Sequence, residues 1–409
     1  MDKIERQRLR DEAYALKLRH RGPEVFFRGL IEISNRCRKN CLYCGIRGGN
    51  QLVDRYEMSD KEVLREAQFA LDAGYGSIAL QGGERTDSAF VERIARLVRG
   101  VRHLRLGGAG EPGAVPNDLG ITLSLGEQSR EVYREWKEAG ASRYLLRIEA
   151  SNRELYEKLH PGHRFTAGCG SGTGAGPADD GNCCREENLH SYDRRVQALV
   201  DLKGEGYLLG SGIMIGLPFQ TYANLDEDLR FLKEMEVDMV GMGPYIPHSD
   251  TPLGKIVEAW RCVPGVLGAA DIPGAADVAD ASGGFASLPE PLRRLASLPR
   301  GDFWNMDNEE LLELCIDMVA RLRIMMPHIN IAATTALQVL HPNGREMALM
   351  AGANVIMPNM TETSLRGSYS LYEGKQGVAD DAASTRDKLL DNLASLGIPV
   401  GWNNKGDWR

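Results

Sequence analysis

Residues 29–44 read Gly-Leu-Ile-Glu-Ile-Ser-Asn-Arg-Cys-Arg-Lys-Asn-Cys-Leu-Tyr-Cys, an apolar run that predicts a strand, followed at once by closely spaced cysteines. The spacing is C-x3-C-x2-C, at Cys37, Cys41 and Cys44. Thiolates this close in sequence can bind one inorganic cluster, and three of them leave one iron of a 4Fe-4S cluster open to another ligand. The stretch therefore predicts a strand that leads into a metal site.

The spacing of the cysteines is also compatible with a zinc site or with core packing. Positions 37, 41 and 44 share one face of a helix, so three cysteines buried in a core would show the same spacing. A structural zinc site normally takes four Cys or His ligands, and a distant cysteine could supply the fourth. The polar residues and glycines at 35–49 predict a loop. The pattern favours an iron–sulfur cluster first, zinc second and core packing last.

The composition is that of an ordinary soluble chain. Of 409 residues 26% are charged and the net charge is −8, which argues against nucleic acid or an anionic membrane as partner. No apolar run approaches the roughly 18 residues of a membrane span. Residues 1–21 are charged and helix-prone, unlike a secretory signal or an acid-poor transit peptide. A reducing, cytoplasmic setting is expected, in which the eight cysteines form no disulfides.

Strand and helix patterns alternate along the chain. A capping box at Ser59 and Glu62 opens the first helix after the cysteines, and Gly74 ends it. Strands are expected at 29–33, 76–81, 120–125, 143–148, 208–215, 238–242, 330–333 and 354–357. Helices are expected at 60–73, 88–99, 129–139, 152–159, 189–204, 223–235, 308–325 and 344–351. This alternation predicts an α/β fold, a complete (βα)8 TIM-type barrel rather than an open sheet.

Three stretches rich in small residues interrupt this rhythm, at about 107–118, 167–187 and 255–302, and are expected to be surface insertions or disordered loops. The expected division is an N-terminal helical extension (1–27), the barrel with its insertions (28–360) and a C-terminal segment (361–409). Cys169, Cys183 and Cys184 lie in the second insertion and are interpreted as incidental thiols rather than metal ligands. No role is assigned to Cys262 or Cys315.

Barrel enzymes carry their chemistry at the carboxyl ends of the strands, and here those ends are polar or rich in glycine. Glu84 can accept an ammonium group and Glu149 can bind ribose hydroxyls. Arg147 or Arg195 can pair with a carboxylate. A tight turn would also explain the glycines, and structural salt bridges would explain the charged residues equally well. The candidates for binding a cofactor at these ends are Gln81, Gly82, Gly83, Glu84, Ser124, Glu127, Arg147, Glu149, Arg195 and Met214.

A second group of candidates follows the later strands. Thr334 and Thr335 present paired hydroxyls that can hold an anion, although such residues often cap helices. His248 can act as a ligand or proton donor, although a lone histidine is more often simply hydrogen-bonded. No Ser/His/Asp or Cys/His nucleophilic set is evident, so no catalytic residue is assigned beyond the cluster ligands.

The cysteine spacing, with the aromatic Tyr43 before the third cysteine, resembles the signature of the radical S-adenosylmethionine (SAM) superfamily. The wider set of motifs is similar to the HydE family, the radical SAM maturases of FeFe-hydrogenase, over about residues 20–375. Biotin synthases and methylornithine synthases share the barrel and the cysteine motif. The motifs are FFRGLIEISNRCRKNCLYCGIR, SIALQGGE, TLSLGE, SRYLLRIEASN, GIMIGLPFQT, DMVGMGPYIPHSDTPL, IAATTAL and GREMALMAGANVIMPN.

The resemblance implies a 4Fe-4S cluster whose open iron binds SAM, and cleavage of SAM to methionine and a 5′-deoxyadenosyl radical. It implies a long internal cavity, with Glu149 and Arg195 contacting SAM and the threonine pair binding an anion. It also implies that Tyr369 or Tyr372 lies near the adenosyl group. The implied substrate is a small cysteine-bound iron carbonyl cyanide unit, and the implied partners are two maturases, a second radical SAM enzyme and a GTPase scaffold.

The sequence departs from many relatives in two places. Residues 376–409 lack the cysteines that hold a second cluster in many family members, so no second cluster is expected. Ile148 stands where many relatives have histidine, which puts a polar contact near SAM in doubt. Two alternatives to the maturase function remain open: a related radical SAM reaction on a small organic substrate, and a metal-bearing scaffold without turnover.

Overall fold

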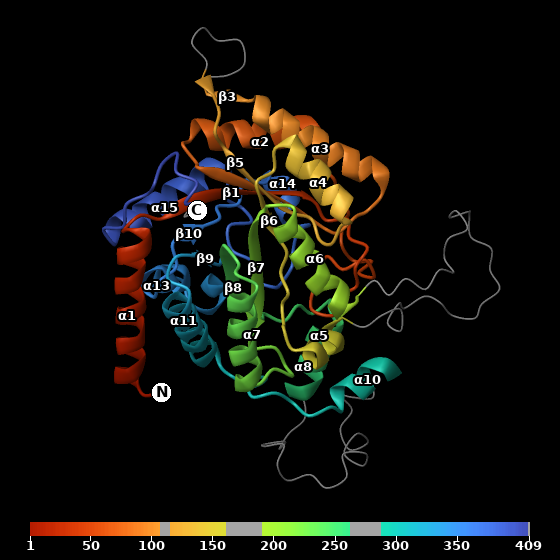
Figure 1. Cartoon of the computed structure of the whole chain (residues 1–409). Helices are drawn as coiled ribbons and strands as arrows, with labels where there is room; N and C mark the ends of the chain where they lie inside the picture. Colours follow the sequence, from red (N-terminus) through yellow and green to blue (C-terminus); the bar gives the residue numbers. More distant parts are fainter. Residues whose placement is uncertain (107–114, 161–189, 262–287, 408–409) are drawn as a thin grey trace, which may run out of the picture.

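The computed structural model describes residues 1–106, 115–160, 190–261 and 288–407, and its centre is a closed barrel of eight parallel strands. The strands follow one another around the barrel in the order β1-β10-β9-β8-β7-β6-β5-β2, which confirms the predicted (βα)8 barrel (Figure 1). The strands are β1 Phe26–Ser34, β2 Ser77–Gly82, β5 Gly120–Ser124, β6 Arg143–Leu145, β7 Leu208–Ile215, β8 Met239–Pro244, β9 Asn330–Ala333 and β10 Val355–Ile356. A separate two-stranded sheet pairs β3 Arg105–Leu106 with β4 Val115–Pro116.

Helices surround the barrel and bury their apolar faces against it. The helices before the second gap are α1 Lys3–Arg21, α2 Asp60–Asp72, α3 Ser88–His103, α4 Arg130–Ala139 and α5 Arg153–Leu159. The later ones are α6 Tyr192–Gly204, α7 Tyr222–Glu234, α8 Pro252–Arg261, α10 Glu290–Ala296, α11 Asn308–Met325, α12 Leu337–Leu340, α13 Gly344–Met350, α14 Thr363–Arg366 and α15 Ala382–Ser395. No helix in these described ranges is long and apolar enough to cross a membrane.

The first helix after the cysteines begins and ends where its sequence predicts. Ser59 Oγ accepts a hydrogen bond from the Glu62 amide (3.3 Å), and Glu62 Oε2 accepts one from the Ser59 amide (2.6 Å), so the predicted capping box is present. Gly74 follows the helix with a φ of 77°, a left-handed conformation that glycine adopts without strain. The helix buries Val63 and Ala67 on the side that faces the barrel.

The strand predicted at 143–148 is shorter in the structure, because β6 ends at Leu145. The chain then leaves regular strand geometry and reaches Glu149 with a φ of 64°. The backbone stays bound to β7 at this point, since the Glu149 amide donates to Gly212 O (2.9 Å). The early end of β6 gives residues 146–149 an irregular path that a period-two pattern does not predict.

The helices α5, α8 and α10 pack together beyond the carboxyl ends of the strands, at the lower right of Figure 1. They bury a second hydrophobic cluster, which includes Leu42 of the cysteine loop, Leu217, Phe219 and Trp260. The stretch predicted as the insertion 255–302 therefore supplies ordered helices on both sides of 262–287. Residues 107–114, the insertion at 167–187 and four of the eight cysteines (169, 183, 184 and 262) lie outside the described residues. The three-part division at 27/28 and 360/361 remains a prediction.

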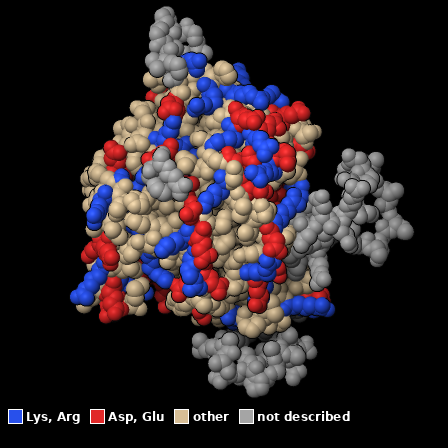
Figure 2. Space-filling model, viewed as in Figure 1, with Lys and Arg blue, Asp and Glu red and all other residues tan. Residues whose placement is uncertain are grey.

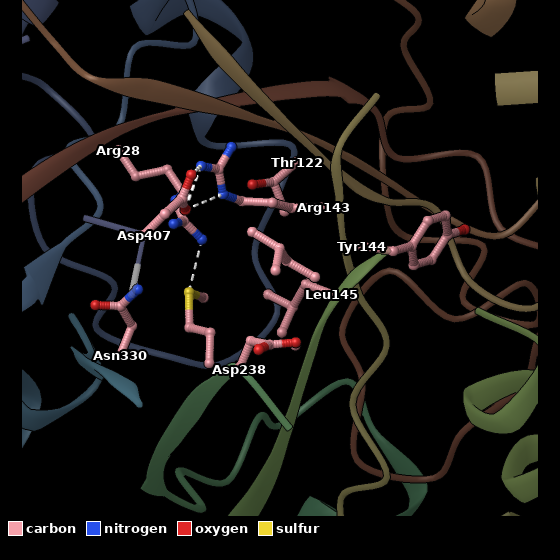
Figure 3. Close-up of a pocket in the computed structure, with 11 residues that line it drawn as sticks. Arg28, Thr122, Arg143, Tyr144, Leu145, Asp238, Asn330 and Asp407 are labelled. Carbon is pink, nitrogen blue, oxygen red and sulfur yellow. Dashed lines mark hydrogen bonds and ion pairs between the residues drawn. The ribbon is translucent and has the colours of Figure 1, made fainter. Parts of the chain in front are cut away.

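The C-terminal tail closes the barrel at the amino ends of the strands (Figure 3). Val400 pairs with Val25, and Asn330 Nδ2 donates to Gly406 O (2.8 Å). Arg143 Nε donates to Asp407 Oδ1 (3.1 Å) beside the fully buried Arg28. Burial and the neighbouring Arg143 lower the pKa of Arg28 to about 9. The void between these groups is only about 20 Å³, so this end of the barrel is packed shut.

Charged residues of both signs mix over the face seen in Figure 2, with no large area of one sign. This distribution matches the modest net charge of −8.

Candidate active site

The three cysteines lie on an irregular loop directly after β1, as predicted, and not on a helix. One guanidinium organises this loop. Arg55 donates to the carbonyl oxygens of Asn35 (2.7 Å) and Ile46 (2.8 Å) through Nη1, and to those of Arg47 (2.7 Å) and Asn50 (2.9 Å) through Nη2. Because four carbonyls converge on one cation, the loop has a fixed shape without regular secondary structure.

The thiols of this loop lie within electrostatic reach of one another. Burial raises the pKa of Cys37, Cys41 and Cys44, and the neighbouring cysteines raise it further for Cys41 and Cys44. Cys37 Sγ also accepts a hydrogen bond from the Glu84 amide (3.3 Å). Thiols in this state need a positive centre to become thiolates, and an iron–sulfur cluster provides one. The donor set therefore fits a cluster.

Within the described ranges, no group of three His, Cys, Asp or Glu residues could hold a single metal ion. The cysteines are compatible with that result, since ligands that each bind a different iron of a cubane stand further apart than the ligands of one ion.

Two buried histidines support the cysteine loop from behind. His160 Nδ1 lies 2.8 Å from Tyr156 O, an acceptor, so Nδ1 carries the proton and Nε2 accepts from the Tyr43 hydroxyl (2.9 Å). His190 Nε2 accepts from the Asn40 amide (2.9 Å). Burial, His190 and Arg195 hold the pKa of His160 well below its usual value, and burial with Lys39 lowers the pKa of His190 to about 3. Both rings are neutral acceptors for the loop.

The glycines after β2 allow a close approach to the cysteine loop. The Gly83 amide donates to Ser34 O (3.0 Å), and a Cβ at Gly83 would lie 2.3 Å from Arg36 O. Gly82 is less restricted, with its nearest neighbour at 3.3 Å. Glu84 follows and is buried. Its carboxylate accepts from the Glu127 amide (2.8 Å) and lies 3.5 Å from Lys39 Nζ.

A buried network of charges joins the cysteine loop to the ends of β5 and β6. Lys39 Nζ contacts Glu127 Oε2 (2.9 Å), and Arg195 Nε contacts Glu127 Oε1 (2.5 Å). Arg195 Nη1 also donates to Arg147 O (2.5 Å). Burial alone would raise the pKa of Glu127, but Arg195 and Lys39 outweigh it and lower that pKa. Burial raises the pKa of Glu84, whose two cationic partners, Lys39 (3.5 Å) and Arg38 (3.7 Å), lie further away.

Arg147 and Glu149 form a bidentate pair inside the barrel. Arg147 Nη1 also donates to Gly241 O (2.6 Å), and Nη2 donates to Ile213 O (2.8 Å). A Cβ at Gly212 would lie 2.0 Å from Gly241 O and 2.8 Å from Arg147 Nη1, so the glycine on β7 leaves room for both the neighbouring strand and the guanidinium. The Arg147 side chain keeps 29% of its surface exposed although it points into the barrel, so open space adjoins it.

The remaining predicted residues fall into two places. Ser124 pairs in register with Gln81, whose Nε2 donates to the Tyr369 hydroxyl (3.3 Å) near the cysteine loop. Thr334 Oγ1 donates to Met242 O (3.2 Å) on the opposite side of the barrel, and Thr335 follows it in the turn before α12.

The other predicted residues are held by local contacts. Met214 packs near the second hydrophobic cluster. His248 Nδ1 accepts from the Asp250 amide (3.2 Å), and its ring lies beside Gly45. Ile148 is fully buried in the main hydrophobic core, so its side chain is part of the packing outside the barrel rather than of the site.

A segment of the C-terminal region crosses the cysteine loop. Residues 368–375, here called the tyrosine strap, include Tyr369 and Tyr372. Asn35 Nδ2 donates to Ser368 O (2.6 Å), and the Gly45 amide donates to Leu371 O (3.1 Å). Burial raises the pKa of both tyrosines. The strap therefore brings the two predicted tyrosines to the cysteines.

Several residues of this site are not predicted from the sequence. Lys39 lies inside the cysteine motif, and this position alone could have marked it as a residue of the site. Arg55 binds carbonyls that lie 5 to 20 residues before it in the chain. His160 and His190 contact a hydroxyl and an amide of the loop from more than 100 residues away. The sequence around these three residues carries no motif. Only the three-dimensional structure shows that these residues lie at the cysteine loop.

Comparison with known proteins shows the family and the fold of the chain. Residues 31–232 match the model of the radical SAM superfamily. The chain is 37% identical over 387 residues to the FeFe hydrogenase maturase subunit HydE of Thermotoga maritima, covering 94% of this chain and 84% of that protein. It is 27% identical over 239 residues to 3-methylornithine synthase of Methanosarcina acetivorans, covering 58% and 56%. The solved structure of methylornithine synthase (PylB) superposes with a TM-score of 0.63 at 21% identity, over 98% of this chain and 91% of that one, which shows a shared fold.

Proposed function

Because the chain belongs to the radical SAM superfamily and, within it, to the HydE family, we propose that it is a maturase that cleaves SAM and acts in assembly of the two-iron subcluster of FeFe-hydrogenase. It is a radical SAM enzyme of the hydrogenase maturase type. The observation that carries the finer proposal is the 37% identity over nearly the whole chain, taken with the three cysteines presented together at the mouth of the barrel.

Family membership implies a 4Fe-4S cluster and SAM. We assign Cys37, Cys41 and Cys44 as the cluster ligands, because their thiols interact with one another in a loop held by Arg55. The bound cluster and SAM together supply a 5′-deoxyadenosyl radical on one-electron reduction. The protein's part is to bind, orient and exclude water, since the cofactors carry the radical chemistry.

The SAM site is proposed on the polar groups that border the cysteine loop. Arg147 and Glu149 offer a cation and a carboxylate inside the barrel, and Arg195 stands behind them. Glu149 suits ribose hydroxyls and Arg147 suits a carboxylate. Gln81 with the Tyr369 hydroxyl supplies a further polar pair on the other side. Glu84 and Glu127 are already bound to Lys39 and Arg195, which suggests that they support the site from behind.

The substrate is proposed to occupy the barrel interior beyond Arg147. Gly212, Gly241 and Gly243 leave the wall of β7 and β8 without side chains, and a Cβ at Gly243 would lie 2.4 Å from Thr334 Oγ1. We place the substrate between Arg147 on one side and the Thr334 hydroxyl on the other. A small anionic iron–sulfur compound, such as a cysteine-bound iron carbonyl cyanide unit, suits a cation and a hydroxyl. We also propose that the protein acts with two partner maturases, a second radical SAM enzyme and a GTPase scaffold.

Anaerobic reconstitution tests the first half of the proposal. We expect a 4Fe-4S signal in electron paramagnetic resonance, a change of that signal on adding SAM, and 5′-deoxyadenosine on reduction. Cys41→Ala should lose the cluster and the 5′-deoxyadenosine together. Cys315→Ala is the matched control, because Cys315 is buried in α11, in the main core. Cluster formation by Cys41→Ala would contradict the ligand assignment.

The substrate half is tested with the reconstituted enzyme, SAM and reductant. Conversion of a cysteine-bound iron carbonyl cyanide complex, but not of free lysine, is the expected result. The 27% identity to 3-methylornithine synthase makes a small organic substrate the second candidate. Conversion of free lysine in the absence of any iron complex would favour that candidate and contradict the maturase role.

A further inference from the structure

A buried ion pair joins the tyrosine strap to the root of the cysteine loop. Lys375 Nζ lies 2.5 Å from Glu32 Oε1, and the side chains are only 11% and 1% exposed. Glu32 is on β1, the strand that leads into the cysteines, and Lys375 is the last residue of the strap. The pair therefore connects two segments that border the same site but lie far apart in the chain.

Glu32 is held by hydrogen bonds to its side chain and to its backbone. Its second carboxylate oxygen accepts from Asn359 Nδ2 (3.0 Å), and its amide donates to Thr361 Oγ1 (2.8 Å). Its carbonyl accepts from the Tyr56 hydroxyl (2.7 Å). With its backbone and side-chain groups all engaged, Glu32 has little freedom to follow a moving partner.

Lys375 connects Glu32 to Tyr369. The same ammonium donates to Tyr369 O (3.1 Å) and lies 5.2 Å from the centre of the Tyr369 ring. Tyr369 is 2% exposed and contacts Gln81 at the end of β2. Lys375 thus holds the backbone and the ring of the tyrosine that faces the proposed SAM site.

The rest of the strap is held by single hydrogen bonds. Leu371 O receives the Gly45 amide, and Glu373 Oε1 receives the Ser249 amide (2.8 Å). A Cβ at Gly45 would lie 2.0 Å from Ser370 O, so the strap rests directly on the cysteine loop. Single bonds of this kind open more readily than a buried ion pair whose two partners are also hydrogen-bonded.

We propose that Lys375 and Glu32 are positioning residues for SAM, whose ion pair holds the tyrosine strap closed over the cysteine loop and its bound SAM. This inference rests on the proposed function, since it concerns the SAM site defined there. Neither residue touches the reacting atoms. Both act through Tyr369 and through the strap's contacts with Gly45.

The test compares Lys375→Met, Lys375→Arg, the double variant Glu32→Gln with Lys375→Met, and wild type, all as reconstituted holoenzyme. Lys388→Met is the matched control, because Lys388 pairs with Asp380 on the surface and is 64% exposed. The iron content of each variant measures how much cluster it holds. Chymotrypsin cleavage at Tyr369 and Tyr372, without SAM, reports strap opening. KM for SAM and kcat for 5′-deoxyadenosine formation report the site.

We expect Lys375→Met to keep its cluster, to be cleaved about tenfold faster in the strap and to raise KM for SAM about tenfold with little change in kcat. Lys375→Arg should have a KM for SAM and a rate of strap cleavage close to those of wild type, because arginine keeps the positive charge. The double variant leaves no unpaired charge buried, so it retains the fold even if Lys375→Met does not, and its KM should still rise.

Unchanged KM and unchanged strap cleavage in the double variant would overturn the inference, and so would a fall in kcat alone. These results leave the proposed function standing, provided that wild type forms the cluster and 5′-deoxyadenosine. If wild type forms neither, the proposed function fails, and strap cleavage still reports whether Lys375 and Glu32 hold the segment.

Discussion

The Glu149 carboxylate receives two parallel hydrogen bonds from the Arg147 guanidinium, Nε to Oε1 at 2.8 Å and Nη2 to Oε2 at 2.9 Å, across one intervening residue. Glu149 makes this pair from a left-handed backbone with a φ of 64°, a conformation that costs a non-glycine residue roughly 1 kcal/mol or more. The two carbonyls that Arg147 also binds fix the cation, and the cation in turn fixes Glu149. The pair is therefore a rigid polar feature inside the barrel.

Glu149→Gln tests the role of this carboxylate. The amide keeps the shape but removes the charge that balances Arg147, so we expect SAM affinity to fall about tenfold and stability to fall by about 1–3 kcal/mol. Equilibrium binding of SAM to the reconstituted protein and thermal unfolding measure the two effects. The control is Glu154→Gln on α5, an acid that is 79% exposed in a surface pair with Lys158. Equal SAM affinity in Glu149→Gln and wild type would remove Glu149 from the proposed site.

Gly83→Ala tests the close contact between β2 and the cysteine loop. The added methyl group would lie 2.3 Å from Arg36 O and 2.7 Å from Cys37 Cβ, so the backbone beside the first cysteine must move. We expect the variant to bind less than half of the wild-type iron after reconstitution. Gly367→Ala is the control, because a Cβ there meets nothing within 4 Å. Full iron content in Gly83→Ala would show that the loop tolerates the shift.

Local features of this chain were predictable, and distant contacts were not. The bounds of α11 and β9 match their predicted ranges. The bounds of α11 follow from its apolar period and its Asp307–Glu310 capping box, and those of β9 from a short apolar run. The irregular path after Leu145 follows from the Arg147–Glu149 pair and from contacts with β7, which no local pattern contains. Lys375 and Glu32 are 343 residues apart in the chain, so only the closed barrel reveals that they meet.

The same contrast applies to the candidate site. The cysteine spacing predicts the metal site, because all three proposed ligands lie on one short loop. The residues that shape that loop come from the segment between the cysteines and α2 (Arg55), from the end of α5 (His160) and from the strap. The tail that closes the other end of the barrel comes from residues 400–407. Arg55 acts through four carbonyls and His160 through one side-chain hydroxyl. Such contacts leave no periodic or compositional trace in the sequence.

His160→Phe tests the support behind the cysteine loop. Phenylalanine keeps the stacking on Tyr156, whose ring centre lies 4.0 Å from that of His160, but it cannot accept the Tyr43 hydroxyl. That hydroxyl is left buried without its partner, which costs about 1–3 kcal/mol. We expect lower thermal stability and faster loss of iron to a chelator. His103→Phe, at the exposed end of α3, is the control and should behave as wild type. Iron loss at the wild-type rate would contradict a supporting role for His160.

Asp228 gives the fold a predictable response to pH. Burial raises the pKa of this α7 carboxyl from 3.8 to about 6, although Ser151 donates to it through its amide (2.6 Å) and hydroxyl (2.7 Å). The folded state therefore holds the proton to a higher pH than the unfolded state. Its contribution to stability is complete below about pH 4 and is lost as the pH rises through about 6, a change of about 3 kcal/mol.

Asp228→Asn removes this titration while its amide oxygen still accepts from Ser151. We expect the variant to gain thermal stability relative to wild type as the pH rises from about 4 to about 6, with no further gain above that. Thermal midpoints of both proteins across this range measure the difference. Asp226→Asn, on the same helix but half exposed, should show no such trend. A constant difference between Asp228→Asn and wild type at every pH would mean that the pKa of Asp228 is the same in the folded and unfolded states, so that its bonds to Ser151 offset its burial.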